Sequence, residues 1–166
     1  LQISTITGGF SGYLGAAGDG VGFRASAGAE VTAKQTFIAE IEGGAAEDGS
    51  LSGSGIGIEI QNATVMLSHA TATNIQEGEH THESNAIAQG LRAEGLTGNA
   101  IVKLDHVIFS DVKGDAGGDG SWCLWSEDSN QASKLQITNS NLHACGPEGS
   151  DGMNYAKNAA VLDGMM

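Results

Sequence analysis

One pattern of apolar positions recurs four times in this chain, and it constrains the fold more than any other feature. Each copy begins with a small residue and continues with apolar positions that alternate with single residues. Further along the copy, two residues and not one separate successive apolar positions, and we call this a two-residue step. The copies occupy residues 29–41, 63–75, 100–112 and 133–145. Six positions keep their spacing inside every copy, while the connections between copies vary in length. Constant units with variable connections are typical of solenoid proteins, whose loops absorb insertions.

The apolar residues of each copy alternate with polar ones, which is the period of a β-strand and not of a helix. The two-residue step predicts a tight bend between two short strands. A third short strand is predicted upstream of each copy, with a glycine in it or directly before it in three cases, Gly22, Gly57 and Gly90. Long connections rich in glycine and acidic residues separate the units.

Three short strands per repeat predict an all-β fold, a right-handed single-stranded parallel β-helix of about four to five coils, with residues 1–166 forming one domain. Like positions of successive coils would stack into columns inside the core. One predicted core column consists of Val31, Val65, Val102 and Leu135. A β-sandwich usually shows turn signals every 8–12 residues or so, and a propeller blade needs four strands in about 40–45 residues, so both fit this repeat less well.

Two segments carry a resemblance to a known class of proteins. Residues 57–67 and 90–104 resemble the coils of autotransporter passengers and pertactin-like surface proteins, and more distantly those of pectate-lyase-type β-helices. The resemblance implies a secreted or cell-surface protein of a bacterium. It carries over no catalytic residue, because no position here matches a catalytic motif of the lyases or hydrolases on this fold, and a packing pattern specifies fold better than function.

The charge of the chain argues against several partners. Seven Lys and Arg residues against twenty Asp and Glu residues give a net charge of −13, which repels nucleic acids and anionic lipid surfaces. The apolar runs are only a few residues long, far below the ~20 that cross a bilayer as a helix. We therefore expect no nucleic-acid partner and no membrane insertion.

The two ends of the chain suggest a partner of another kind. Residues 1–5 match residues 135–139, so the chain is expected to begin at the second strand of a unit, and residues 159–163 look like the first strand of a further unit. The tail of one copy would then complete the broken coil at the head of the next, a heterologous contact that generates filaments. The alternative is a fragment of a longer passenger. The expected interface residues are Leu1, Ile3, Ala160, Val161 and Leu162.

Cys123 and Cys145 are the two cysteines, and they lie 22 residues apart, close to one coil in path. Cys145 occupies the inward position that Ile41, Ile75 and Val112 hold in the other copies. A buried disulfide is therefore predicted, and it would imply an oxidising compartment. Two buried free thiols are the alternative.

Two connections contain residues of the kind that bind metal ions. Glu77, Glu79, His80, His82 and Glu83 crowd one of them, but their spacing is unspecific and favours a solvated acidic loop. The other, residues 114–120, resembles half of a calcium-binding repeat, but it occurs once and favours a flexible turn. We expect no cofactor, apart from weak calcium binding by the acidic surface.

Few aromatic and imidazole side chains could serve as binding groups. Trp122 and Trp125 are separated by an odd number of residues, so alternation predicts that they lie on opposite faces of a strand. If Cys123 points inward, Trp122 is the exposed one and is a candidate to stack on a sugar or on a neighbouring subunit. His69, His106 and His143 are expected outside the core or at its edges.

These observations favour a non-enzymatic, extracellular or cell-surface structural protein, from a prokaryote, that stacks head to tail into a filament or forms an adhesive stalk. A second hypothesis is an enzyme that acts on polysaccharides, although the seven scattered basic residues would neutralise an anionic glycan poorly. A third is a module that binds surface glycans, which a row of exposed aromatic residues would indicate.

Overall fold

The computed structural model of the chain describes residues 1–12, 15–47, 51–79, 86–114, 121–127, 135–147, 154–156 and 161–163. These residues form strands and turns, and no helix occurs among them. None of the described segments could therefore cross a bilayer as a helix.

Short strands follow one another along the described chain and contain the β-branched and apolar residues of the repeat. In chain order they are β1 (Gln2–Thr7), β2 (Gly20–Ser26), β3 (Glu30–Lys34), β4 (Phe37–Glu42), β5 (Gly55–Gln61), β6 (Thr64–Gln76), β7 (Ala88–Glu94), β8 (Val102–Gly114), β9 (Trp122–Glu127), β10 (Leu135–Thr138), β11 (Asn141–Pro147), β12 (Asn154–Ala156) and β13 (Val161–Asp163).

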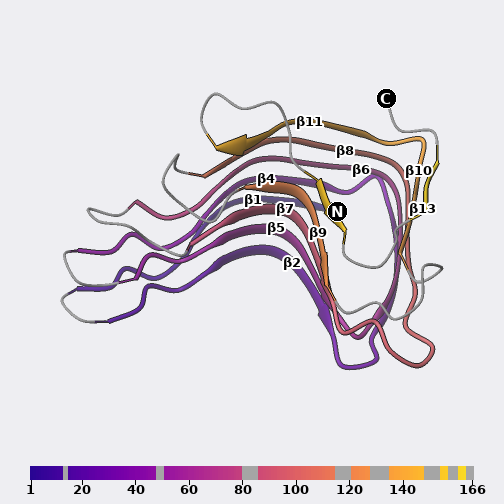
Figure 1. Cartoon of the computed structure of the whole chain (residues 1–166), viewed down its shortest axis with the longest axis horizontal. Coiled ribbons are helices and arrows are strands. Elements are labelled where there is room, and N and C mark those ends of the chain that lie inside the picture. The colour runs from indigo at the N-terminus through magenta and orange to yellow at the C-terminus, as the bar shows by residue number, and fades with distance from the viewer. Residues whose placement is uncertain are drawn as a thin grey trace.

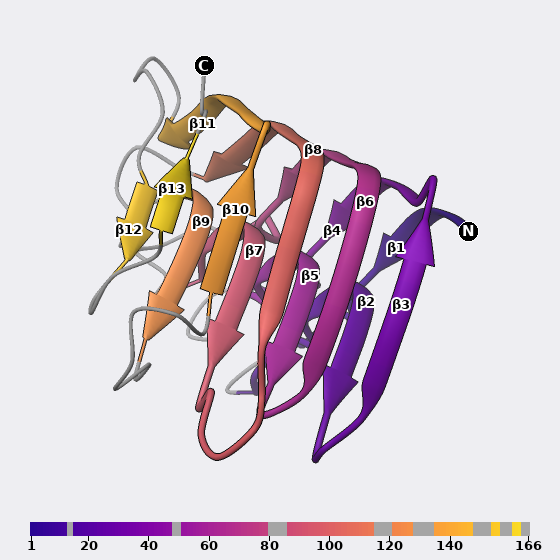
Figure 2. The same ribbon diagram turned by 90° about the vertical axis from the view of Figure 1, so that its right-hand side faces the viewer.

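The strands form two sheets, and within each sheet all paired strands are parallel. One sheet has the order β1-β4-β6-β8-β10-β13, with β3 also paired to β6 and β11 to β8, and the other has the order β12-β9-β7-β5-β2. Figure 1 shows the two sheets as layers that bend together, and Figure 2 shows successive coils side by side. The predicted parallel β-helix is confirmed, with about four turns.

The register between coils follows the repeat of the sequence. Val31 pairs with Val65, Val65 with Val102, and Val102 with Leu135, so these residues form one column. Val65, Val102 and Leu135 are fully buried, whereas Val31 in the first coil is only half-buried. Apolar side chains that repeat at the same position in each coil exclude water from one continuous core, which is the main stabilising term in such a fold.

Each coil turns at corners where one residue adopts a left-handed backbone. The predicted bend is present at His69 and His106, with φ near 54° at each, but the strand continues through it, so that β6 and β8 each include both predicted strands. A second corner, at Asn74 and Asp111, lies at the second two-residue step of the pattern. A left-handed residue lets two successive side chains face outward, which explains why the apolar spacing lengthens there.

Beyond the core, the two layers approach so closely that glycines of one layer form backbone hydrogen bonds with glycines of the other. The N–H of Gly18 donates to the carbonyl of Gly9, and Gly44 donates to Gly18, each at 2.8 Å. Gly53 then donates to Gly44, and Gly78 to Gly53, each at 2.9 Å. We call these five residues the glycine ladder. The connections that composition marks as loops therefore contain an ordered backbone network.

The register of β1 differs from the sequence expectation. Residues 1–5 do not take the position of residues 135–139; instead, Ile3 pairs with Ile38 and Ile6 with Ile41, which makes β1 a third strand of its coil. The three-residue step from Ile3 to Ile6 matches the step from Ile38 to Ile41, and a left-handed residue, Thr5, lies inside it. The expectation rested on alternation alone and missed this corner.

The assignment of the last segment is also corrected. Residues 159–163 were expected to form the first strand of a further unit, but β12 takes that place by pairing with β9. β13 is the second strand of the same partial coil and pairs with β10, with Leu162 next to Ile137. Figure 2 shows β12 and β13 at the end of the stack opposite to β1.

Candidate functional site

The first candidate site is the end of the stack formed by β1, β2 and β3, which we call the β1 rim. Among the described strands, each of these three pairs along one edge only, with β4, β5 and β6 respectively. The other edge of each strand leaves backbone N–H and C=O groups available for a further parallel strand.

The apolar core is also open at the β1 rim. Ile3, Phe23 and Val31 pack against the core but are only half-buried. Their neighbours one coil further in, Ile38, Ile58 and Val65, are all completely buried. Leu1 is 60% exposed at the same end. The rim therefore combines unpaired strand edges with exposed apolar surface, which is the composition of an interface.

We call the opposite end of the stack the β13 rim, and among the described strands β11, β12 and β13 each pair along one edge only there. β11 occupies the same position in its coil as β1, while β12 corresponds to β2 and β13 to β3. Of the predicted interface residues, Leu1 and Ile3 lie at the β1 rim, and Val161 and Leu162 belong to β13. Ala160 lies outside the described residues.

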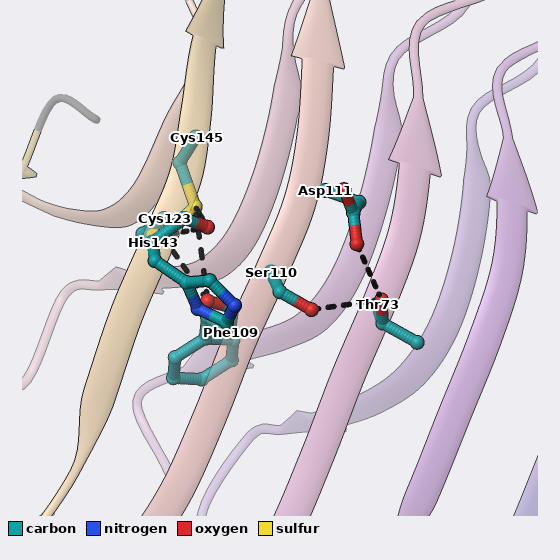
Figure 3. Close-up of a disulfide and its surroundings, with 7 residues drawn as sticks. All are labelled: Thr73, Phe109, Ser110, Asp111, Cys123, His143 and Cys145. Carbon is teal, nitrogen blue, oxygen red and sulfur yellow. Dashed lines mark hydrogen bonds between the residues drawn. A yellow bond between two sulfur atoms is a disulfide. The ribbon is translucent and has the colours of Figure 1, made fainter. Parts of the chain in front are cut away.

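A disulfide joins Cys123 of β9 to Cys145 of β11 across the interior of the fourth coil, with a Cα–Cα distance of 5.2 Å. Both side chains are buried. Figure 3 shows the bond beside Phe109 and His143; the Sγ of Cys123 lies 3.6 Å from the carbonyl of Phe109, and the Sγ of Cys145 lies 3.3 Å from that of His143. The bond fixes one sheet to the other within a single coil.

The two tryptophans do not lie on opposite faces, as alternation predicted. The rings of Trp122 and Trp125 contact each other edge to face at 5.6 Å, and both residues are half-buried. Cys123 and Leu124 between them both belong to the core, so two successive side chains point inward. The strand therefore has a corner at this point, and the expectation that Trp122 alone is exposed was wrong.

A ridge of planar polar side chains runs along the first corner and was not singled out from the sequence as a group. The imidazoles of His69 and His106 stack in parallel, with centroids 4.9 Å apart. The carboxylate of Asp105 contacts Nδ1 of His106 at 2.9 Å and accepts hydrogen bonds from Asn139 and Thr138. These hydrogen bonds, that from Asn139 foremost, lower the pKa of Asp105 to about 2.

The ridge borders a shallow groove of about 390 Å³ whose lining includes Thr71 and Ile108. Ile108 is part-exposed there, so the groove is partly apolar. The sequence signal that could have placed His69 and His106 in one column is their equivalent position in the second and third copies of the repeat.

The structure does not assemble a metal site from the residues that it describes. Among them, no group of three or more His, Cys, Asp or Glu side chains is placed to hold a metal ion. Glu77 and Glu79 are described, whereas His80, His82, Glu83 and residues 115–120 lie outside the described ranges. The predictions for these two loops, and for calcium on the acidic surface, stay predictions.

Comparison of the chain with models of protein families, with curated proteins and with solved structures found no match.

Proposed function

We propose that this chain is a non-enzymatic structural protein, a β-helical subunit of the autotransporter-passenger type that stacks end to end outside the cell or on its surface. The observation that carries the proposal is the β1 rim, where three edges that have no partner among the described strands surround half-buried apolar residues of the core. Such a rim binds most favourably to another layer of the same cross-section.

The β13 rim of a second copy supplies a matching layer. In a stack, β1 of one copy would pair with β11 of the next, β2 with β12 and β3 with β13. Each backbone hydrogen bond formed in this way contributes about 0.5–1.5 kcal/mol. Burial of Ile3, Phe23 and Val31 adds about 25 cal/mol for each Å² of apolar surface removed from water. The disulfide supports the proposed location, because such bonds persist in oxidising compartments.

The test replaces an inward residue at the β1 rim and compares it with its outward neighbour. Val31→Lys places a charge in the proposed contact between copies, whereas Thr32→Lys adds the same charge on the outer face of β3. Sedimentation velocity and negative-stain microscopy should show filaments for the parent chain and for Thr32→Lys, and short or single particles for Val31→Lys.

Thermal unfolding followed by circular dichroism checks that both variants are folded. Monodisperse particles from the parent chain would contradict the proposal and favour the view that preceding coils of a longer chain cover the rim. Equal stacking of the two lysine variants would also contradict it.

A further inference from the structure

At one corner of the five-stranded sheet, three successive coils each have a glycine at the same inward position. Gly22, Gly57 and Gly90 occupy equivalent positions there, because the pairs on either side of them are in register. A Cβ on Gly22 would lie 2.6 Å from Cγ2 of Ile38, and one on Gly57 would lie 2.5 Å from Cδ1 of Ile75. Only glycine fits, because the large side chain of the opposite sheet fills the space.

In the fourth coil the next residue of this column is Cys123, not glycine, by the register of β7 with β9. The opposite position holds Ile41 in the first coil, Ile75 in the second and Val112 in the third, and it holds Cys145 in the fourth. The disulfide therefore occupies the place where a glycine lies opposite an isoleucine in the first two coils and opposite a valine in the third. Two unbonded thiols need a wider separation than two bonded sulfurs, and protein interiors are close-packed, so reduction should overpack the core of this coil.

The fourth coil also contains buried polar groups that lower its stability. Ser126 occupies the position of Ile60 and Ala93, and its hydroxyl is buried without a hydrogen-bond partner among the described residues. The hydroxyl of Ser121 is buried in the same way. Buried polar groups without partners lower the free energy of unfolding, so this coil depends on its disulfide more than a fully apolar coil would.

The fourth coil is also the one on which the β13 rim is built. β9 pairs with β12, β10 pairs with β13, and β11 pairs along one edge only among the described strands. The disulfide joins β9 to β11, so it fixes the relative position of strands that an incoming copy would have to match.

We propose that the Cys123–Cys145 disulfide is a redox lock on the β13 rim, one that permits end-to-end stacking when formed and prevents it when reduced. This inference rests on the proposed function. A dithiol reductant breaks the Sγ–Sγ bond, supplies two electrons and two protons to give two thiols, and is itself oxidised to a disulfide. The first three coils, which contain no disulfide, keep their apolar cores and stay folded.

The experiment compares the oxidised and the dithiothreitol-reduced full-length chain, with the thiol state verified by alkylation and mass spectrometry. Hydrogen exchange should show that β9 and β11 lose protection on reduction, while β5 and β6 keep theirs. Sedimentation should show that the reduced chain no longer stacks. Unchanged exchange and unchanged stacking of the reduced chain would overturn the lock.

A matched variant copies the residue pair of the second coil into the fourth. Cys123→Gly with Cys145→Ile restores the pair found at Gly57 and Ile75, so this variant should stack equally with and without dithiothreitol. Cys123→Ser with Cys145→Ser should stack in neither condition, because it buries two hydroxyl groups. Full stacking of the serine variant would contradict the inference.

The two proposals fail in different ways. If the oxidised chain does not stack, the proposed function fails, and with it the control of stacking, whatever the exchange data show. If the oxidised and reduced chains both stack, the proposed function stands and the lock alone is overturned.

Discussion

Gln89 places a primary amide where the preceding coil has an isoleucine. The two residues are in register, Gln89 of β7 beside Ile56 of β5, and both are completely buried. In the part of the chain that the structure describes, neither Nε2 nor Oε1 of Gln89 has a hydrogen-bond partner. A buried amide without partners loses its bonds to water and gains nothing in return, so this residue lowers the free energy of unfolding.

Gln89→Leu should therefore raise the free energy of unfolding, by about 1–3 kcal/mol, because it removes the desolvation penalty and keeps most of the side-chain volume. Urea denaturation followed by circular dichroism measures the change. Gln61→Leu is the control, since Gln61 is exposed at the end of β5 and its replacement should leave stability nearly unchanged. A loss of stability in Gln89→Leu would show that the amide has a role that the folded chain requires.

Single residues also explain where alternation misled the sequence analysis. The apolar spacing predicted the columns of the core, because stacking forces like residues onto like. It could not assign β1, because five residues fit two positions of the repeat and the left-handed Thr5 has no signature of its own. It could not place Trp122 and Trp125 together, because the corner at Cys123 has no glycine to mark it.

The glycine ladder is an ordered element that the composition of the chain did not predict. Glycine and acidic residues together are typical of flexible connections, yet here the absence of side chains lets two layers of backbone donate hydrogen bonds to each other. A Cβ on Gly44 would lie 2.1 Å from the carbonyl oxygen of Gly9, whereas a Cβ on Gly9 would have no atom within 4 Å. The two positions of one ladder thus differ sharply in what they tolerate.

Gly44→Ala should lower the free energy of unfolding by about 1–3 kcal/mol, because the added methyl group forces the two layers apart. Hydrogen exchange should show faster exchange of the amides of Gly53 and Gly78, which lie further along the ladder. Gly9→Ala should change neither quantity by a comparable amount. Equal effects of the two substitutions would mean that the layers are not packed as closely as the ladder requires.

The whole molecule is a stack with two rims of matching strand type, and its net charge of −13 opposes association. Salt screens this repulsion, with a Debye length of about 8 Å at physiological ionic strength, so backbone pairing and apolar contact at the rims decide the outcome there. The repeat could predict that the rims are edges of a parallel β-helix. The ends of the sequence also predicted that one copy would complete the next, but they could not show which strands match, because that depends on the register of β1, β12 and β13.

The most direct test of stacking is a cross-link that reads this register, made in the Cys123→Gly/Cys145→Ile background. Gln2 and Asn141 hold the same outward position in β1 and β11. In a stack they would be neighbours on adjacent parallel strands about 4.8 Å apart, within the Cα–Cα range of a disulfide. Within one chain, β1 and β11 lie at opposite ends of the stack, so these two residues are too far apart to form a disulfide.

Gln2→Cys with Asn141→Cys should therefore give a ladder of covalent multimers on a non-reducing gel after mild oxidation. Gln2→Cys with Thr138→Cys, which lies out of register, should give few or none. Absence of multimers from the matched pair, or equal yields from the two pairs, would contradict the account.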